Sequence, residues 1–186
     1  MDNPGAPAGE PKRSPRRGLH LFCPDRLVNS VLEIAPAELR QQGIRGIILD
    51  LDNTLVPWRR EEISPDVMAW LTRLKSEGFQ LCILSNSVLS RRSERIATLL
   101  GCPNVRQARK PRRQGFRRAM EAMGTTPAET AVIGDQMFTD ILGGNRSGIY
   151  TIMVRPLHSR EFLYTRLVSR PPERLLLRLF RRRGYL

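Results

Sequence analysis

The sequence predicts an α/β fold in which a parallel central sheet carries helices on both faces. Short apolar runs typical of buried parallel strands alternate with segments of helical periodicity. The expected strands are 46–49, 79–84, 131–133 and 150–154, with a shorter one around Val105. The expected helices between them are 64–77, 89–100, 112–123 and 139–144. This alternation is typical of a parallel sheet that helices cover on both sides.

Several of these helices have boundary signals in the sequence. Pro65 stands in the first turn of the 64–77 helix and Gly78 lies just beyond its end, while Gly124 follows the 112–123 helix. Another short amphipathic helix is expected to begin at Pro24, because apolar side chains recur there at helical spacing. They are Leu27, Val28, Val31, Leu32 and Ile34. We interpret this helix as a cover for one face of the core.

Length and composition indicate one compact domain with two basic extensions. The chain has 186 residues, enough to bury a sizeable core. Residues 1–18 are rich in Pro, Gly and Arg and are expected to be a disordered basic arm; the domain is expected at 19–168, and a basic amphipathic tail at 169–186. The formal charge of +13 favours anionic partners: phosphorylated substrates, lipid headgroups or nucleic acid.

The cysteines and the hydropathy pattern indicate the compartment. Three cysteines without CxxC spacing argue against a disulfide framework or a zinc site. The first residues lack the apolar stretch of a signal peptide, and no segment approaches the roughly 20 apolar residues that span a bilayer. We therefore expect a cytoplasmic protein that is soluble or, at most, peripheral at the inner face of the membrane.

Polar and acidic side chains follow three of the predicted strands. These are Asp50 and Asp52, then Ser85 and Asn86, then Asp135 with Asp140 shortly after, while Lys110 lies in a loop before the last of these strands. Each has an ordinary interpretation as a turn, a helix N-cap or a solvated lysine. In a parallel sheet, however, the carboxyl ends of the strands share one edge, and clustered carboxylates repel unless a cation holds them.

The four segments resemble, in order, the motifs of the haloacid dehalogenase (HAD) superfamily. The segment 50–54 matches DxDxT, Ser85 the second motif, Lys110 the third and 134–140 the fourth. The resemblance covers about residues 21–166 and implies a HAD-like Rossmannoid three-layer fold. The intervals between motifs are too short for a cap domain, so we expect no cap. An open site suits a macromolecule or a headgroup at a membrane surface.

The resemblance also implies catalytic and metal-binding roles. Asp50 would be the nucleophile that forms an aspartyl-phosphate, and Asp52 would act as general acid and then general base. Mg²⁺ would be held by Asp50, Asp135 and the backbone carbonyl of Asp52. Three roles stay open for Asp140: direct metal ligand, water-mediated ligand, or a residue that orients Lys110.

The second and third motifs would bind the phosphoryl group. The resemblance implies that Ser85, Asn86 and Lys110 contact its oxygens and stabilise their charge in the transition state. The arginines around Lys110 are interpreted as a solvated face or as charge that attracts substrate. The two histidines lack metal-ligand spacing.

The detailed wording of the motifs is similar to the YqeG group of HAD subclass IIIA phosphatases, which is related to mitochondrial phosphatidylglycerophosphate phosphatase. The resemblance implies removal of the terminal phosphate of phosphatidylglycerophosphate to give phosphatidylglycerol. Alternatives are a phosphoprotein, nucleotide or sugar phosphate substrate, or an RNA- or ribosome-binding protein on a HAD scaffold. The binding role ranks second, because aromatic side chains are few in this sequence and a scaffold that had lost catalysis need not retain all four motifs.

The C-terminal tail has the pattern of a basic amphipathic helix. A helical wheel places Arg174, Arg178, Arg181 and Arg182 on one side. Leu175, Leu176, Leu177, Leu179 and Phe180 lie mostly on the other. Residues 171–186 are thereby predicted to contact an anionic bilayer and to bring the site to lipid. Packing of the apolar face on the domain, and nucleic-acid binding, stay open as alternatives.

Overall fold

The computed structural model describes residues 16–57, 60, 62–86, 91–157 and 170–185. In this part of the chain, six parallel strands form one sheet in the order β1-β6-β5-β2-β3-β4. The strands are β1 (Arg26–Val28), β2 (Gly46–Leu49), β3 (Gln80–Leu84), β4 (Asn104–Val105), β5 (Thr130–Gly134) and β6 (Tyr150–Val154). The predicted parallel sheet is confirmed.

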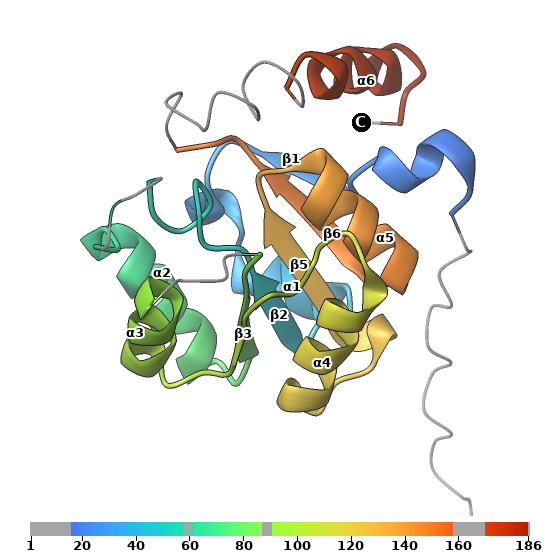
Figure 1. The fold of residues 1–186 in the computed structure, drawn as a ribbon. Coiled ribbons are helices and arrows are strands. Elements are labelled where there is room, and N and C mark those ends of the chain that lie inside the picture. Colours follow the sequence, from blue (N-terminus) through green and yellow to red (C-terminus); the bar gives the residue numbers. More distant parts are fainter. Residues whose placement is uncertain (1–15, 58–59, 61, 87–90, 158–169, 186) are drawn as a thin grey trace, which may run out of the picture.

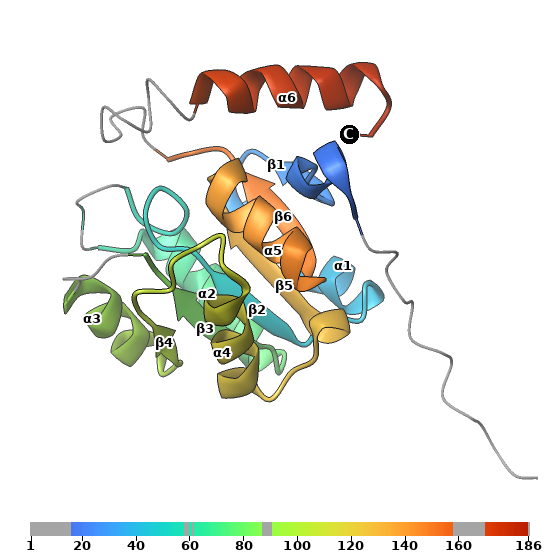
Figure 2. The same ribbon diagram turned by 45° about the vertical axis from the view of Figure 1, so that its right-hand side comes forward.

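Helices cover both faces of this sheet, as the sequence predicts. The α-helices are α1 (Pro36–Gln41), α2 (Pro65–Ser76), α3 (Arg91–Leu100), α4 (Arg113–Met123), α5 (Leu142–Ser147) and α6 (Arg170–Arg182). Four shorter turns are the 3-10 helices η1 (Gly18–Phe22), η2 (Val31–Glu33) and η3 (Pro127–Glu129) and the π-helical turn η4 (Met137–Ile141). Figures 1 and 2 show α2 and α3 on one face, with α4 and α5 on the other.

The strand β2 shows why the central strands are apolar throughout. Ile47 and Leu49 pack in one hydrophobic cluster with Leu71 of α2. Ile48 points to the opposite face, where it packs in a second cluster with Phe116 of α4. Successive side chains of a strand alternate between faces, so a strand covered on both sides must be apolar at every position. The result is a three-layer α/β/α arrangement.

The prediction of a helix that begins at Pro24 is wrong. Residues 26–28 form the edge strand β1, which pairs with β6, and the Asp25 carboxylate accepts a hydrogen bond from the backbone N–H of Thr151 at 2.8 Å. The apolar spacing of this segment fits a helix as well as a strand. Pairing with β6, which lies far along the sequence, makes residues 26–28 a strand. Val31 and Ile34 are nevertheless buried against the core, so the segment does cover it.

The ends of the domain differ in detail from the expected boundaries. Residues 1–15 of the expected basic arm lie outside the described residues, as do 158–169 at the expected start of the tail. Arg16 forms an ion pair with Asp25 and donates to the carbonyl of Cys23, and η1 begins at Gly18. The ordered contacts of the domain thus begin before residue 19.

The described residues between the motifs contain α2 and β3, then α3 and β4, and no further domain covers the sheet edge there. The helix α6 lies across the end of the sheet near β1 and the Gly18–Phe22 turn (Figures 1 and 2). Of the helices in the described ranges, none has the length and apolar character needed to cross a bilayer.

Candidate active site

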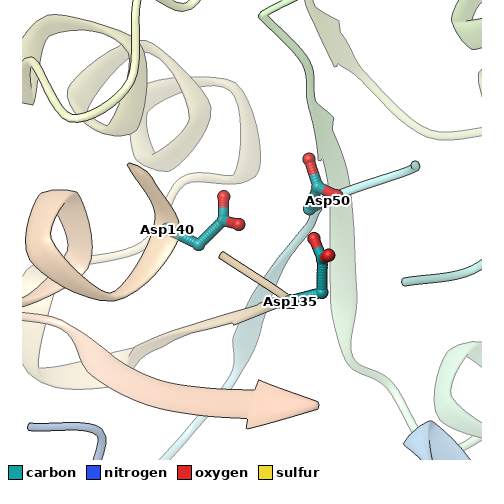
Figure 3. A group of neighbouring side chains, drawn as sticks. All are labelled: Asp50, Asp135 and Asp140. Atoms are coloured by element: carbon teal, nitrogen blue, oxygen red, sulfur yellow. The ribbon is translucent and has the colours of Figure 1, made fainter. Parts of the chain in front are cut away.

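Three buried aspartates meet at the carboxyl edge of the sheet. Asp50 directly follows β2, Asp135 directly follows the neighbouring strand β5, and Asp140 lies on η4. One carboxylate oxygen from each lies within 4.8 Å of the others. Figure 3 shows the three carboxylates turned toward a common space. The structure therefore brings together Asp50 of the first motif with Asp135 and Asp140 of the fourth, as the parallel sheet predicts.

Lys110 completes this cluster. Its ammonium Nζ lies 2.5 Å from Oδ1 of Asp50 and 2.7 Å from Oδ1 of Asp140, and its side chain is only 3% exposed. Burial by itself would lower the pKa of Lys110, but the charges of Asp140 and Asp50 outweigh it and raise the pKa. The lysine is a permanent cation of the site.

The charge balance of the cluster fits a divalent cation. Three carboxylates and one ammonium give this cluster a formal charge of −2. Burial, opposed by Lys110 and reinforced by Asp50, raises the pKa of Asp140 to about 6, which reflects the cost of holding these charges away from water. An all-oxygen donor set suits a hard ion such as Mg²⁺. Asp50, Asp135 and Asp140 are thus the residues that could hold a metal.

The turn after β2 explains the spacing of the first motif. Asn53 has a φ of 60°, a left-handed conformation that Asn tolerates better than most residues, and its N–H donates to the carbonyl of Val56 at 2.8 Å. The turn brings Thr54 back to the strand end, where its hydroxyl donates to Oδ2 of Asp50 at 3.2 Å. Thr54 therefore orients the Asp50 carboxylate, a contact that the sequence pattern left without a role.

Asp52 lies outside the buried carboxylate cluster. Its side chain is 30% exposed and forms an ion pair with Arg92 of α3. Arg92 also donates to the backbone carbonyl of Arg60 at 2.9 Å, so one guanidinium ties the turn after β2 to α3. Sequence reasoning missed Arg92, because it belongs to none of the four motifs. The metal contact expected for Asp52 involves its backbone carbonyl and stays a prediction.

The second motif supports the lysine. Ser85 is buried at the end of β3, and its carbonyl accepts from Ala108 in the loop that leads to Lys110. The side chain of Asn86 brackets the backbone of Lys110: Oδ1 accepts its N–H at 2.7 Å and Nδ2 donates to its carbonyl at 3.3 Å. Asn86 thus holds the Lys110 backbone in place, and the phosphate contact expected of it stays a prediction.

Two glycines, one in the fourth motif and one shortly after it, are required by close packing. A Cβ at Gly134 would lie 2.4 Å from Cγ of Asp140, and a Cβ at Gly143 would lie 2.3 Å from the ring of Phe116. The first glycine lets η4 fold back onto the strand end, and the second lets α5 approach α4. Both approaches keep Asp140 within reach of Lys110.

Comparison with known proteins agrees with this arrangement. The model of the haloacid dehalogenase-like hydrolase family matches residues 56–148, half of the chain. The chain is 39% identical over 165 residues to the probable phosphatase YqeG of Bacillus subtilis, covering 89% of this chain and 95% of that protein.

The chain belongs to the haloacid dehalogenase-like hydrolase family. Within this family it is a YqeG-like phosphatase.

More distant relatives of this HAD phosphatase are named as lipid phosphatases. It is 27% identical to phosphatidylglycerophosphate phosphatase 1 of Arabidopsis thaliana, covering 78% of this chain and 44% of that one. It is 29% identical to the mitochondrial phosphatidylglycerophosphatase of Saccharomyces cerevisiae, covering 72% and 78%. A solved structure of an uncharacterized Listeria monocytogenes protein shares the fold, with a TM-score of 0.51, 22% identity and coverage of 72% and 98%.

Proposed function

We propose that this HAD phosphatase removes the terminal phosphate of phosphatidylglycerophosphate and leaves phosphatidylglycerol. The observation that carries the proposal is the buried cluster of Asp50, Asp135, Asp140 and Lys110 at an uncapped sheet edge, in a chain whose distant relatives are named for this lipid. A site without a cap in the described residues can approach a headgroup that stays in its bilayer. The place of action would be the inner face of the cytoplasmic membrane.

The two aspartates of the first motif would divide the chemistry. An Oδ atom of Asp50 attacks phosphorus while the bond from phosphorus to the headgroup oxygen breaks, and Asp52 gives that oxygen a proton. A water then attacks the aspartyl-phosphate, Asp52 takes its proton, and inorganic phosphate leaves. Oδ1 of Asp50 lies against Lys110 and Oδ2 against Thr54, so its orientation is set before substrate binds.

Mg²⁺ is the cofactor that fits this site. Asp50, Asp135 and Asp140 would hold it, together with the carbonyl of Asp52, and it would neutralise charge on the phosphoryl oxygens. Lys110, with Ser85 and Asn86 beside it, would bind the same oxygens from the other side. Three roles were open for Asp140. Its 2.7 Å contact with Lys110 fits a residue that orients the lysine, and its place among the carboxylates fits direct or water-mediated ligation.

The outer face of α6 would contact the membrane. Arg174, Arg178 and Arg182 are exposed on one side of this helix, and Leu175 stands among them with 67% of its surface exposed. Exposed arginines with an apolar side chain between them suit an anionic lipid surface. Nucleic acid stays the alternative partner for this basic face.

The substrate is tested by phosphate release from phosphatidylglycerophosphate in mixed vesicles, beside a soluble aryl phosphate. We expect turnover that requires Mg²⁺, stops with chelator and is absent in Asp50→Asn. Cleavage of the aryl phosphate alone would keep the phosphatase and reject the lipid, pointing to a phosphoprotein, nucleotide or sugar phosphate. Salt-dependent RNA binding without any phosphate release would favour the binding role.

The membrane contact is tested with matched charge removals. Arg178→Ala with Arg182→Ala takes two charges from α6, and Arg117→Ala with Arg118→Ala takes two from α4. We expect only the α6 pair to weaken binding to vesicles that contain phosphatidylglycerol, with aryl phosphate turnover preserved in both. Equal weakening by both pairs, or by neither, would reject α6 as the docking surface.

A further inference from the structure

The inner face of α6 contacts the segment that carries Asp140. Glu173, in the first turn of α6, is 2% exposed, and its Oε1 accepts the backbone N–H of Met137 at 3.0 Å. Met137 is the first residue of η4. The first N–H groups of a helical turn have no acceptor within the turn itself, so Glu173 supplies one from 36 residues away.

An apolar contact reinforces this hydrogen bond. Phe180 of α6 is also 2% exposed and packs in a cluster with Met137 and Ile141, the two ends of η4. Leu176 and Leu177 are partly buried against the same cluster. The helix therefore holds η4 both through the hydrogen bond of Glu173 and through apolar packing. The apolar face of the tail thus packs on the domain, which is one of the alternatives that the sequence left open. Leu175, in contrast, is exposed.

The segment held in this way determines where two acidic residues lie. Asp135 directly precedes η4 and Asp140 is part of it. Within the turn, the N–H of Asp140 donates to the carbonyl of Gln136 at 2.9 Å, and Oδ2 of Asp140 accepts the N–H of Gln136 at 3.2 Å. The other oxygen of Asp140 accepts from Lys110. A displacement of Met137 would thus move Asp140 relative to Asp50.

The burial of Glu173 argues for a role beyond apolar packing. A carboxylate taken out of water costs free energy unless it is hydrogen-bonded, and an apolar side chain would fill the same space without that cost. A carboxylate oxygen, in contrast, fixes the backbone of Met137 at a defined distance. Turns of π-helix occur often at functional sites, where they set the direction of a side chain.

We propose that Glu173 is a positioning residue for the metal centre. It holds η4 so that Asp140 stays beside Lys110 and within reach of the ion that Asp50 and Asp135 would share. The C-terminal helix is then a working part of the active site, and not only a membrane contact. This inference rests on the phosphatase activity and is independent of which phosphomonoester is the substrate.

The experiment compares Glu173→Ala, Glu173→Gln and the control Glu121→Ala, at an exposed glutamate of α4, in the full chain. Mg²⁺ affinity is measured by calorimetry without substrate, and kcat and KM with a soluble aryl phosphate. The loss of a residue that orients metal ligands typically weakens metal affinity by about 10- to 100-fold. In Glu173→Ala we expect about 10-fold weaker Mg²⁺ binding, with a lower kcat and a smaller change in KM. Glu173→Gln keeps an amide oxygen to accept from Met137 and should recover most of both.

Two results would overturn the proposal. One is Mg²⁺ affinity and kcat in Glu173→Ala equal to those of Glu121→Ala, even with a lower melting temperature, because that leaves only a structural role. The other is a Glu173→Gln protein no better than Glu173→Ala. If the alanine variant does not fold, Glu173→Asp replaces it: its carboxylate is one methylene short of Met137, so wild-type Mg²⁺ affinity there would also reject the proposal. If the wild-type protein cleaves the aryl phosphate but not phosphatidylglycerophosphate, the proposed substrate is rejected and the proposal for Glu173 is unaffected.

Discussion

The carboxyl edge of β2 and β5 and the layer formed by η1, η4 and α6 contribute to the same site in different ways. At the sheet edge, Asp50 and Asp135 directly follow neighbouring strands, so forming the sheet is enough to bring them together. In the outer layer, Met137 and Ile141 contact Phe180, a residue about 40 positions later that no motif includes. The positions of Asp50 and Asp135 thus follow directly from the strands that precede them. The position of η4, in contrast, depends on a helix from a distant part of the chain.

The two regions also differ in energetic character. The sheet edge buries three carboxylates and one ammonium, whose desolvation costs free energy that their mutual attraction only partly offsets. The outer layer buries apolar side chains around Met137 and Phe180, which stabilises the fold. Substitutions at the edge should therefore act first on rate, and those in the outer layer first on stability.

The largest expected effect is that of Asp50→Asn. Loss of the proposed nucleophile should lower turnover of an aryl phosphate by more than about 1,000-fold, because the rest of the site would be unable to form the covalent intermediate. The fold should be retained, since asparagine has nearly the same volume. Asp66→Asn, on the exposed first turn of α2, is the control. Turnover within tenfold of wild type would exclude Asp50 as the nucleophile.

Lys110→Met should reduce stability as well as activity. Removal of one partner from a buried ion pair typically costs about 3–5 kcal/mol. We expect a cost of this size here, because without Lys110 the carboxylates of Asp50 and Asp140 face each other. Denaturant unfolding without metal measures this cost, and saturating Mg²⁺ should recover part of it. Lys75→Met, at an exposed lysine of α2 whose ammonium donates to the carbonyl of Leu100, should cost less, about 1 kcal/mol. An unchanged free energy of unfolding would contradict the charge balance of the site.

A pair of phenylalanine truncations compares the two regions directly. Phe116→Ala, in the core under α4, should cost about 3–5 kcal/mol of global stability. Phe180→Ala should cost less and should mainly release α6 and η4, because both lie in the outer layer and not in the core of the sheet. Hydrogen exchange would show protection lost at η4 and α6 but kept in β2 and β5. Equal loss across the whole sheet would mean that α6 is part of the main cooperative unit.

Arg92→Ala should have the smallest effect. The ion pair with Asp52 is partly exposed, and such pairs contribute at most about 1 kcal/mol, which corresponds to about fivefold in rate. We expect kcat to fall by up to that factor, because the carboxylate of Asp52 loses the group that orients it. Arg91→Ala, the neighbouring exposed arginine, serves as the control. A loss greater than about 100-fold would give Arg92 a direct role in substrate binding.

The sequence by itself determined the alternation of strands and helices and the residues of the carboxylate cluster. The apolar runs at 46–49 and 131–133 are short and typical of buried strands, and in a parallel sheet the residues that follow them share an edge. Both signals are local, so they can be read without knowledge of the rest of the chain. Lys110 could be assigned only through the resemblance to a family, because its loop has no periodicity.

The tertiary structure alone decided the contacts between distant segments. Residues 26–28 form a strand because the edge of β6 lies beside them, and Asn86 brackets the Lys110 backbone because two loops meet. Glu173 and Phe180 turn inward because η4 offers an N–H and two apolar side chains, and Leu175 is thereby left exposed. Periodicity shows that a helix has an apolar face, but the surface that this face meets depends on segments folded elsewhere in the chain.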